Sequence, residues 1–237
     1  MMAPTTWLKA YWQAGRDPAG PACAPSAEHA NAVPAVVPIR SLGEAYRGRI
    51  AAHLLTLDAE DRYLRFGFAA SDEQVQRYVD QLDFERDEIF GIYNRRLELI
   101  AMAHLAYAAD PAARSAAEFG VSVLRQARGK GLGARLFDRA VMSARNEGVS
   151  TLFIHALSEN TAMLKIARKA GAVVQRDGSE SEAYLTLPAA SLDSRVAEIV
   201  EQQFAEMDYR FKVQSKHFWD LMHRVHGARR GRHATVR

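Results

Sequence analysis

The segment of residues 118–133 constrains the fold most strongly. It reads as an apolar strand followed by a loop with three glycines in five residues, and the loop opens a helix that begins near Leu132. Glycine adopts positive φ angles and lets the backbone approach a ligand closely. A helix N-terminus presents unpaired N–H groups and a partial positive charge. The segment is therefore a candidate anion site at a strand-to-helix turn.

Taken alone, such a turn leaves alternatives open, and one of them is a tight connection that binds nothing. Two familiar phosphate motifs do not fit. No Ser or Thr follows Lys130, as a P-loop requires, and the glycines have the spacing G-x-G-x-G. A dinucleotide-binding fold places its glycine turn after the first strand, whereas this turn lies halfway along the chain.

The patterns around the turn predict an α/β domain. Strands are expected at residues 33–40, 89–93, 97–107, 118–124, 150–157, 172–175 and 183–187, and helices at 41–57, from Ser71, at 132–147 and at 160–170. Ser41 is expected to cap the first helix, and Ser71 with Gln74 forms a capping box for the second. The order β-α-α-β-β-β-α-β-α-β-β predicts a mixed sheet with helices on both faces.

The N-terminal segment has a different composition. Six of the eight prolines fall within residues 1–38, and we expect residues 1–32 to be disordered. Trp7, Leu8, Tyr11 and Trp12 share an apolar helical face that could dock on the domain or on a partner. The single cysteine, Cys23, is interpreted as an incidental thiol. Neither a signal peptide nor a membrane span is predicted, so we expect a cytoplasmic protein that does not insert into membranes.

The C-terminal region is predicted to be helical and then basic. Residues 189–226 form a helical extension with Val196, Ile199, Val200, Phe204 and Met207 at helical spacing. This extension is expected to pack on the domain, and a homodimer contact is the alternative. Residues 227–237 are expected to form a basic, disordered tail. Such a tail can bind nucleic acid, but a solvated end is the favoured interpretation.

Two motifs resemble the GNAT superfamily of N-acetyltransferases. Gln126-x-x-Gly129-x-Gly131 resembles its Q/R-x-x-G-x-G/A signature, in the same context of a preceding strand and a following helix. Asn160 opens a helix that Gly171 closes eleven residues later, which resembles a second motif of that superfamily. The resemblance implies a GNAT fold, with a mixed, mostly antiparallel sheet and a catalytic domain at residues 33–188.

The resemblance also implies acetyl-CoA as the co-substrate. The fourth and fifth strands would diverge, and the pantetheine arm would lie between them. Val121, Ser122 and Val123 would contact this arm, the first and last of them through backbone hydrogen bonds, and Asn160 would bond it from beyond the fifth strand. The pyrophosphate would bind at Arg128, Gly129, Lys130, Gly131, Leu132, Gly133 and Ala134. No metal site is expected.

Glu118 is the candidate general base. Alternation along the strand places it on one face with Gly120 and Ser122, opposite Phe119, Val121 and Val123. Members that resemble bacterial protein lysine acetyltransferases carry a Glu here, and the alternative is an edge carboxylate paired with an arginine. An amine acceptor, either a small molecule or a protein lysine, would attack acetyl-CoA directly in a ternary complex. A backbone N–H near Val121 would stabilise the oxyanion.

The sequence departs from the commoner pattern at Ala167, where many members have a tyrosine near the sulfur. The thiolate would leave unprotonated or take a proton from water, and His155 and Ser158 are candidate substitutes for the acid. His104 is interpreted as structural. The missing tyrosine keeps open a non-catalytic acyl-CoA sensor or scaffold.

The segment 62–66, Arg-Tyr-Leu-Arg-Phe, together with Ala167 resembles the branch of bacterial protein lysine acetyltransferases. Arg62 and Arg65 are expected to pair with nearby acidic residues rather than to contact an acidic substrate. The acidic residues considered as their partners are Asp58, Glu60 and Asp61.

Overall fold

The computed structural model describes residues 37–108, 115–178 and 180–233. Several expectations lie outside these residues. They are the disorder of residues 1–32, the apolar face that includes Trp7 and Trp12, the environment of Cys23, and the last four residues of the basic tail.

A single sheet of seven strands in the order β1-β2-β3-β4-β5-β7-β6 forms the centre of the domain. The strands are β1 (Arg40–Ser41), β2 (Glu88–Tyr93), β3 (Leu99–Tyr107), β4 (Ala116–Val123), β5 (Thr151–Leu157), β6 (Val173–Asp177) and β7 (Glu180–Thr186). Every neighbouring pair is antiparallel except β4 and β5. That pair is parallel because helix α5 (Leu132–Asn146) carries the chain back to the starting edge. The predicted mixed, mostly antiparallel sheet is confirmed.

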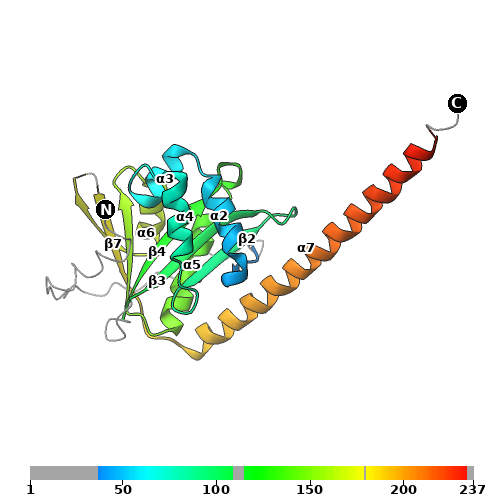
Figure 1. Cartoon of the computed structure of the whole chain (residues 1–237). Helices are drawn as coiled ribbons and strands as arrows, with labels where there is room; N and C mark the ends of the chain where they lie inside the picture. The colour runs from blue at the N-terminus through cyan, green and yellow to red at the C-terminus, as the bar shows by residue number, and fades with distance from the viewer. Residues whose placement is uncertain (1–36, 109–114, 179, 234–237) are drawn as a thin grey trace. The chain divides into compact units, whose positions relative to one another are not determined.

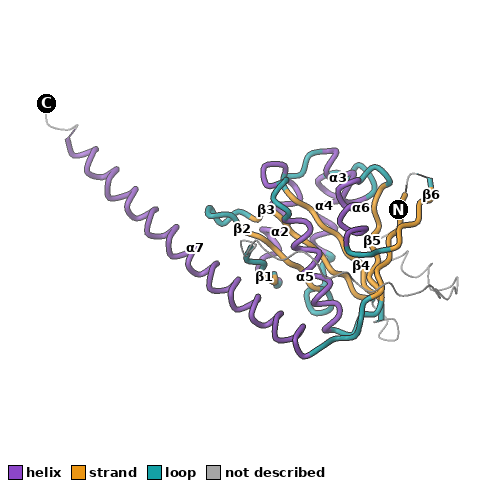
Figure 2. Tube along the Cα trace, turned by 180° about the vertical axis from the view of Figure 1, so that it is seen from behind, coloured by secondary structure: helices purple, strands orange, loops and turns teal. Residues whose placement is uncertain are grey.

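Helices cover both faces of the sheet, as predicted. On one face, α2 (Arg47–Leu55) and α4 (Asp72–Asp80) bury apolar side chains against Met102 of β3. On the other face, α5 and α6 (Thr161–Lys169) pack on Phe119 of β4 and Ile154 of β5. Figure 1 shows α2 and α4 in front of the sheet, and Figure 2, turned by 180°, shows α5 on the opposite side.

The predicted strand at 33–40 and the predicted helix start at Ser41 are wrong within the described residues. Only Arg40 and Ser41 form β1, and Ser41 pairs with Phe90 of β2. Pro38 has no N–H group, so it cannot donate to a ladder that extends further back. Ser41 therefore lies in the sheet. A 3₁₀ turn, η1 (Glu44–Tyr46), leads into α2, which has no side-chain cap.

Helix α3 (Ala59–Phe66) was not predicted. Asp58 caps it, because its carboxylate accepts a 2.8 Å hydrogen bond from the N–H of Asp61, and Gly67 ends it with φ 78°. Both are ordinary helix-boundary signals in the sequence. The predicted capping box at α4 is confirmed, since Ser71 and Gln74 exchange both hydrogen bonds.

The C-terminal region is one helix, α7 (Leu192–His233), which contacts α5 and β1. The predicted boundary at residue 226 is wrong, because the helix continues through Gly227 to His233. Gly227 and Gly231 each cost the helix only about 1 kcal/mol, which does not by itself end it. Among the residues that the structure describes, no helix is both long and apolar enough to cross a membrane.

Candidate functional site

Strands β4 and β5 separate partway along their length. Their ladder joins only residues 116–118 to residues 151–153, and its last pair is Glu118 with Phe153. Both strands then continue, β4 to Val123 and β5 to Leu157. Within the described part of the chain, the β4–β5 ladder does not resume past that pair. The structure thus shows the divergence that was expected of the fourth and fifth strands.

The glycine turn lies at the end of β4. Gly129 has φ 75° and Gly131 has φ 71°, and both angles are in the left-handed region that favours glycine. Gly131 is the N-cap of α5, and its carbonyl accepts the N–H of Arg135 at 3.1 Å. The N–H groups of residues 132–134 precede this first helical bond and donate to no acceptor among the described residues. The turn therefore offers donors suited to an anion.

Arg128 uses its polar groups within the protein. Its Nε donates to the Val123 carbonyl at 3.2 Å, and its guanidinium donates to the Asp61 carboxylate. Its backbone N–H donates to the Arg125 carbonyl at 3.3 Å. Lys130 is exposed and makes no ion pair in the described structure. Lys130, rather than Arg128, is therefore the side-chain cation of the turn that remains available to an anion.

Helix α3 lies where β4 and β5 diverge, because it contacts both strands. Asn160 joins it to α6. The Asn160 side chain accepts from the N–H of Met163 at 3.1 Å, which caps α6, and its amide donates to the carbonyl of Leu64 at 3.4 Å. The ion pair between Asp61 and Arg128 joins α3 to the glycine turn. The three residues Asp61, Arg128 and Asn160 thus link α3 to the predicted cofactor site.

The partners expected for Arg62 and Arg65 are wrong. Arg62 pairs with Asp72 at 2.6 Å, and Arg65 donates to the hydroxyl of Tyr78 at 2.9 Å. The acidic residues in and before the first turn of α3 pair instead with arginines after β4. These pairs are Asp58 with Arg125 at 2.8 Å, Glu60 with Arg125 at 3.8 Å, and Asp61 with Arg128.

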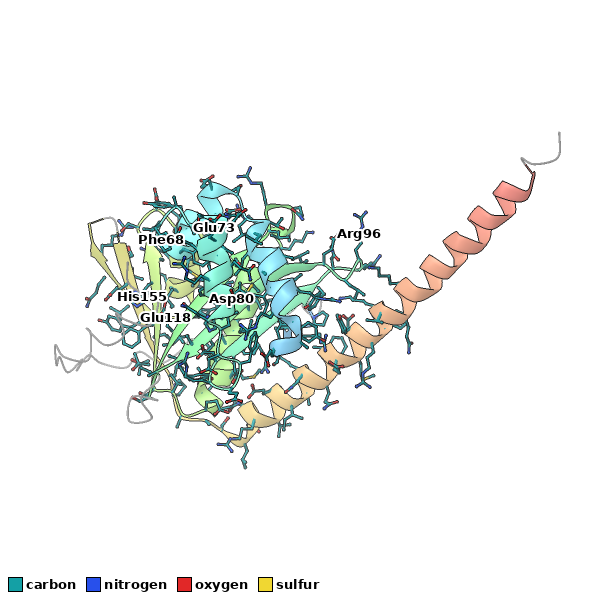
Figure 3. The ribbon with its side chains drawn as sticks, viewed as in Figure 1. Phe68, Glu73, Asp80, Arg96, Glu118 and His155 are labelled. Carbon is teal, nitrogen blue, oxygen red and sulfur yellow. The ribbon has the colours of Figure 1, made fainter. Side chains whose placement is uncertain are left out.

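Glu118 is half-buried on the sheet face that it shares with Gly120. The guanidinium of Arg65 lies over Gly120, so closely that a Cβ at this glycine would be 2.8 Å from its Cζ. Burial raises the pKa of Glu118 to about 7, and the charge of Arg65 acts in the opposite direction. Figure 3 labels Glu118 on β4 and His155 on β5. A carboxyl group that titrates near neutral pH therefore lies at the point where the strands separate.

A chain of polar groups, most of them partly buried, holds Arg65 in place. The Tyr78 hydroxyl accepts from Arg65 and lies 2.7 Å from His104 Nδ1, while His104 Nε2 lies 3.0 Å from Asp87. Because the tyrosine already accepts from Arg65, its proton points to Nδ1, and His104 donates from Nε2 to Asp87. Arg86 completes the chain with a 2.8 Å bond to Asp87. His104 thus has a structural role, as expected, but the roles of Tyr78 and Asp87 in this chain were not predicted.

Ser122 is tied to the core through its side chain. Its hydroxyl lies 2.8 Å from Nε2 of His53, and His53 Nδ1 lies 2.8 Å from the carbonyl of Leu99. Burial lowers the pKa of His53 to about 4, so the ring is neutral. His53 therefore donates from Nδ1 to the carbonyl and accepts the Ser122 proton at Nε2. Because its hydroxyl is bonded to His53, Ser122 can contact a ligand only through its backbone.

The residues considered as the general acid, His155 and Ser158, have polar neighbours on β7. His155 Nδ1 lies 3.5 Å from Glu182 of β7, and burial lowers the pKa of His155 to about 4. Ser158 Oγ lies 2.9 Å from Ser181 Oγ, and Ala167 is buried in α6. No group of three or more His, Cys, Asp and Glu side chains suited to a metal occurs among the described residues.

A comparison with protein families places the chain in a class of transferases. Residues 51–172 match the model of the Acetyltransferase (GNAT) family. The match spans half of the chain, and the chain belongs to this family.

Solved structures share the fold. The GNAT domain of PAT from S. lividans has a TM-score of 0.55 and 20% identity over 64% of this chain and 94% of its own. An acetyltransferase of the GNAT family from Streptococcus pneumoniae has a TM-score of 0.52 and 12% identity over 63% and 98%. The protein yncA of Salmonella typhimurium, solved with its cofactor acetyl-CoA, has a TM-score of 0.51 and 16% identity over 65% and 96%.

Proposed function

We propose that this protein transfers the acetyl group of acetyl-CoA to a primary amine, with Glu118 as the general base. The observation that carries the proposal is the position of Glu118 in the last residue pair before β4 and β5 diverge. Its pKa of about 7 suits a group that must accept a proton near neutral pH and release it again.

The residues present fit coenzyme A. The free N–H groups of residues 132–134, with the charge of Lys130 beside them, suit the pyrophosphate. Val121 and Val123 lie on the part of β4 that no longer pairs with β5, so backbone groups on that edge are available to the amides of pantetheine, except the Val123 carbonyl, which accepts from Arg128. The relative from Salmonella typhimurium, solved with acetyl-CoA, supports the same donor here.

The chemistry follows from these positions. Glu118 takes a proton from the amine, whose nitrogen forms a C–N bond with the thioester carbonyl carbon. The C–S bond breaks, and coenzyme A leaves as the thiolate. A backbone N–H near Val121 stabilises the oxyanion. Because Ala167 has no polar group and His155 is neutral, the thiolate takes its proton from water. A free thiol has a pKa of about 8.5, so departure as the thiolate is feasible.

The acceptor is a primary amine, either of a protein lysine or of a small molecule. The segment 62–66 and Ala167, which resemble the branch of bacterial protein lysine acetyltransferases, support the protein lysine. A panel of lysine peptides and small amines, with thiol release as the signal, separates these two classes of acceptor.

The test of the base is Glu118→Gln. We expect the rate of thiol release to fall by about a hundredfold or more, while calorimetry shows unchanged binding of coenzyme A. Glu85→Gln is the matched control, because Glu85 is exposed and lies outside the site. An unchanged rate in Glu118→Gln across the pH range refutes the assignment. Failure of the intact protein to bind coenzyme A refutes the function as a whole.

A second candidate function is a non-catalytic acyl-CoA sensor. It is favoured because Ala167 has no side-chain group that can donate a proton to the thiolate and because His155 is neutral. Binding of acetyl-CoA without turnover on any acceptor of the panel would establish it over the enzyme.

A further inference from the structure

The face of α7 that contacts the domain is polar and is held by ion pairs. Glu198 pairs with Arg139 of α5 at 2.8 Å, and Glu206 pairs with Arg40 of β1 at 2.6 Å. Further along, Lys212 donates to the carbonyl of Tyr93 at 3.0 Å. These contacts fix the rotation of α7 about its axis over this stretch.

Aromatic contacts strengthen the same face. Tyr209 of α7 packs edge-on against Tyr93, with ring centroids 5.2 Å apart, and the Arg40 guanidinium lies 3.8 Å from the centroid of the Tyr209 ring. Ala205 is 1% exposed. The inner face of α7 is therefore defined by Glu198, Ala205, Tyr209 and Lys212.

The opposite face of α7 is apolar and exposed. Among the described side chains of α7, which end at residue 216, seven large hydrophobic ones on this face are between 45% and 83% exposed, and we call them the outer stripe. They are Leu192, Val196, Ile199, Val200, Phe204, Met207 and Phe211. At about 100° per residue, these positions centre on the side opposite Glu198 and Ala205. The helix thus presents its polar side to the protein and its apolar side to solvent, the reverse of an ordinary surface helix.

The charges of α7 are divided along its length. Residues 192–208 contain five acidic residues and one basic residue, whereas residues 209–233 contain seven arginines and lysines and one acidic residue. Two copies of the helix side by side and parallel would bring like charges together. Two antiparallel copies would place each acidic half beside a basic half. The helix is therefore complementary to itself in one orientation.

We propose that the outer stripe is a docking surface for α7 of a second copy of this chain, with the two helices antiparallel. A two-fold axis then crosses the helices near their middle, and each outer stripe packs on the second half of the partner helix. The 42 residues of α7 provide a contact about 60 Å long. Figure 2 shows α7 as one continuous helix.

The exposed area agrees with such a contact. At roughly 150 to 200 Å² for each large apolar side chain, the outer stripe exposes on the order of 700 Å². A stable interface needs about 800 Å² from each partner. A membrane is a poorer occupant, because residues 192–211 contain five acidic and two basic residues and would be repelled by anionic lipid.

Sedimentation velocity of the full chain over a wide concentration range tests the proposal. We expect a dimer, and the double substitution Val200→Glu with Met207→Glu should weaken it by about tenfold or more in Kd. Val173→Glu is the matched control, because Val173 is also an exposed apolar residue, 52% exposed, but lies on β6. Unchanged circular dichroism and binding of coenzyme A would show that the double variant is folded.

Charge reversal tests the orientation. Arg229→Glu with Arg230→Glu should weaken the dimer, and adding Asp193→Arg with Glu201→Arg should restore it, since the reversed halves again attract. A monomer at all concentrations overturns the proposal, as does a dimer that survives the outer-stripe substitutions. A monomer that floats with phosphatidylserine vesicles would assign the outer stripe to a membrane and likewise overturn it.

Discussion

The guanidinium of Arg65 occupies the space above Gly120 that a side chain would fill, with a Cβ at Gly120 placed 2.8 Å from its Cζ. Glu118 lies two residues away on the same face of β4. Burial raises the pKa of Glu118, the charge of Arg65 lowers it, and the net value is about 7. Tyr78, His104 and Asp87 hold Arg65 there, so their hydrogen bonds act on Glu118 through Arg65.

We predict that Arg65→Gln moves the pH midpoint of kcat/KM upward from near 7 by roughly one pH unit, because the opposing charge is lost. Gly120→Ala should move it in the same direction, since the new methyl group displaces the guanidinium. Arg65→Lys keeps the charge and should leave the midpoint close to that of the natural protein. If the pH midpoint of kcat/KM does not move in Arg65→Gln, Arg65 has only a structural role.

The stability of the protein should depend on Glu118 in a defined pH window. Its pKa in the folded state, about 7, is above the ordinary value of 4.5, so its neutral form is favoured by folding. This contribution is complete below pH 4.5 and is lost as the pH rises through 7. Relative to Glu118→Gln, the natural protein should lose about 1–3 kcal/mol of unfolding free energy across this window.

Urea unfolding of the natural protein, Glu118→Gln and Glu85→Gln between pH 4.5 and 8 measures this difference. Glu85→Gln should follow the natural protein at every pH, since Glu85 is exposed. Parallel curves for the natural protein and Glu118→Gln would mean that Glu118 titrates as an ordinary surface residue.

Gly131→Ala should weaken binding of coenzyme A by about tenfold and cost about 1 kcal/mol of stability, because alanine is strained at φ 71°. Gly148 is a matched control, since it has φ 85° and follows the C-terminus of α5. Gly148→Ala should cost similar stability without an effect on coenzyme A. Calorimetry and thermal melts separate the two effects, and equal losses of affinity in both variants would contradict a ligand site at the turn.

Ser122→Ala should destabilise the protein by about 1–3 kcal/mol, because it leaves Nε2 of His53 without a donor in the core. The affinity for coenzyme A and the pH profile should not change. The double variant His53→Leu with Ser122→Ala should recover part of the stability, since it removes the unpaired ring nitrogen, although the carbonyl of Leu99 then loses its donor. A loss of affinity in Ser122→Ala at unchanged stability would assign its hydroxyl to the ligand.

Short-range features of the sequence were enough to place the glycine turn and the second motif. Gly129 and Gly131 adopt positive φ, and Asn160 caps α6, as expected from residues within one helical turn of each position. Alternation along β4 likewise placed Glu118 on the face away from Phe119. These features depend on backbone sterics and hydrogen bonds between near neighbours, which the local sequence specifies.

Helix α3 was missed although Asp58 and Gly67 mark its ends, because no apolar periodicity accompanies these signals: its described buried residue is Asp61. Its stability comes instead from contacts with β4 and β5 and from the pairing of Asp61 with Arg128. Such contacts join residues far apart in sequence and cannot be read from a local pattern.

The sequence by itself thus determined the family fold, the turn and the carboxylate on β4. Only the tertiary structure decided which acidic residue pairs with each arginine. It alone also showed that Arg65 lies over Gly120 and that the apolar side of α7 faces solvent. Alternative pairings of charged residues differ little in energy, because surface ion pairs are worth only about 0–1 kcal/mol. The choice among them follows from how the helices pack on the sheet, which depends on the whole core.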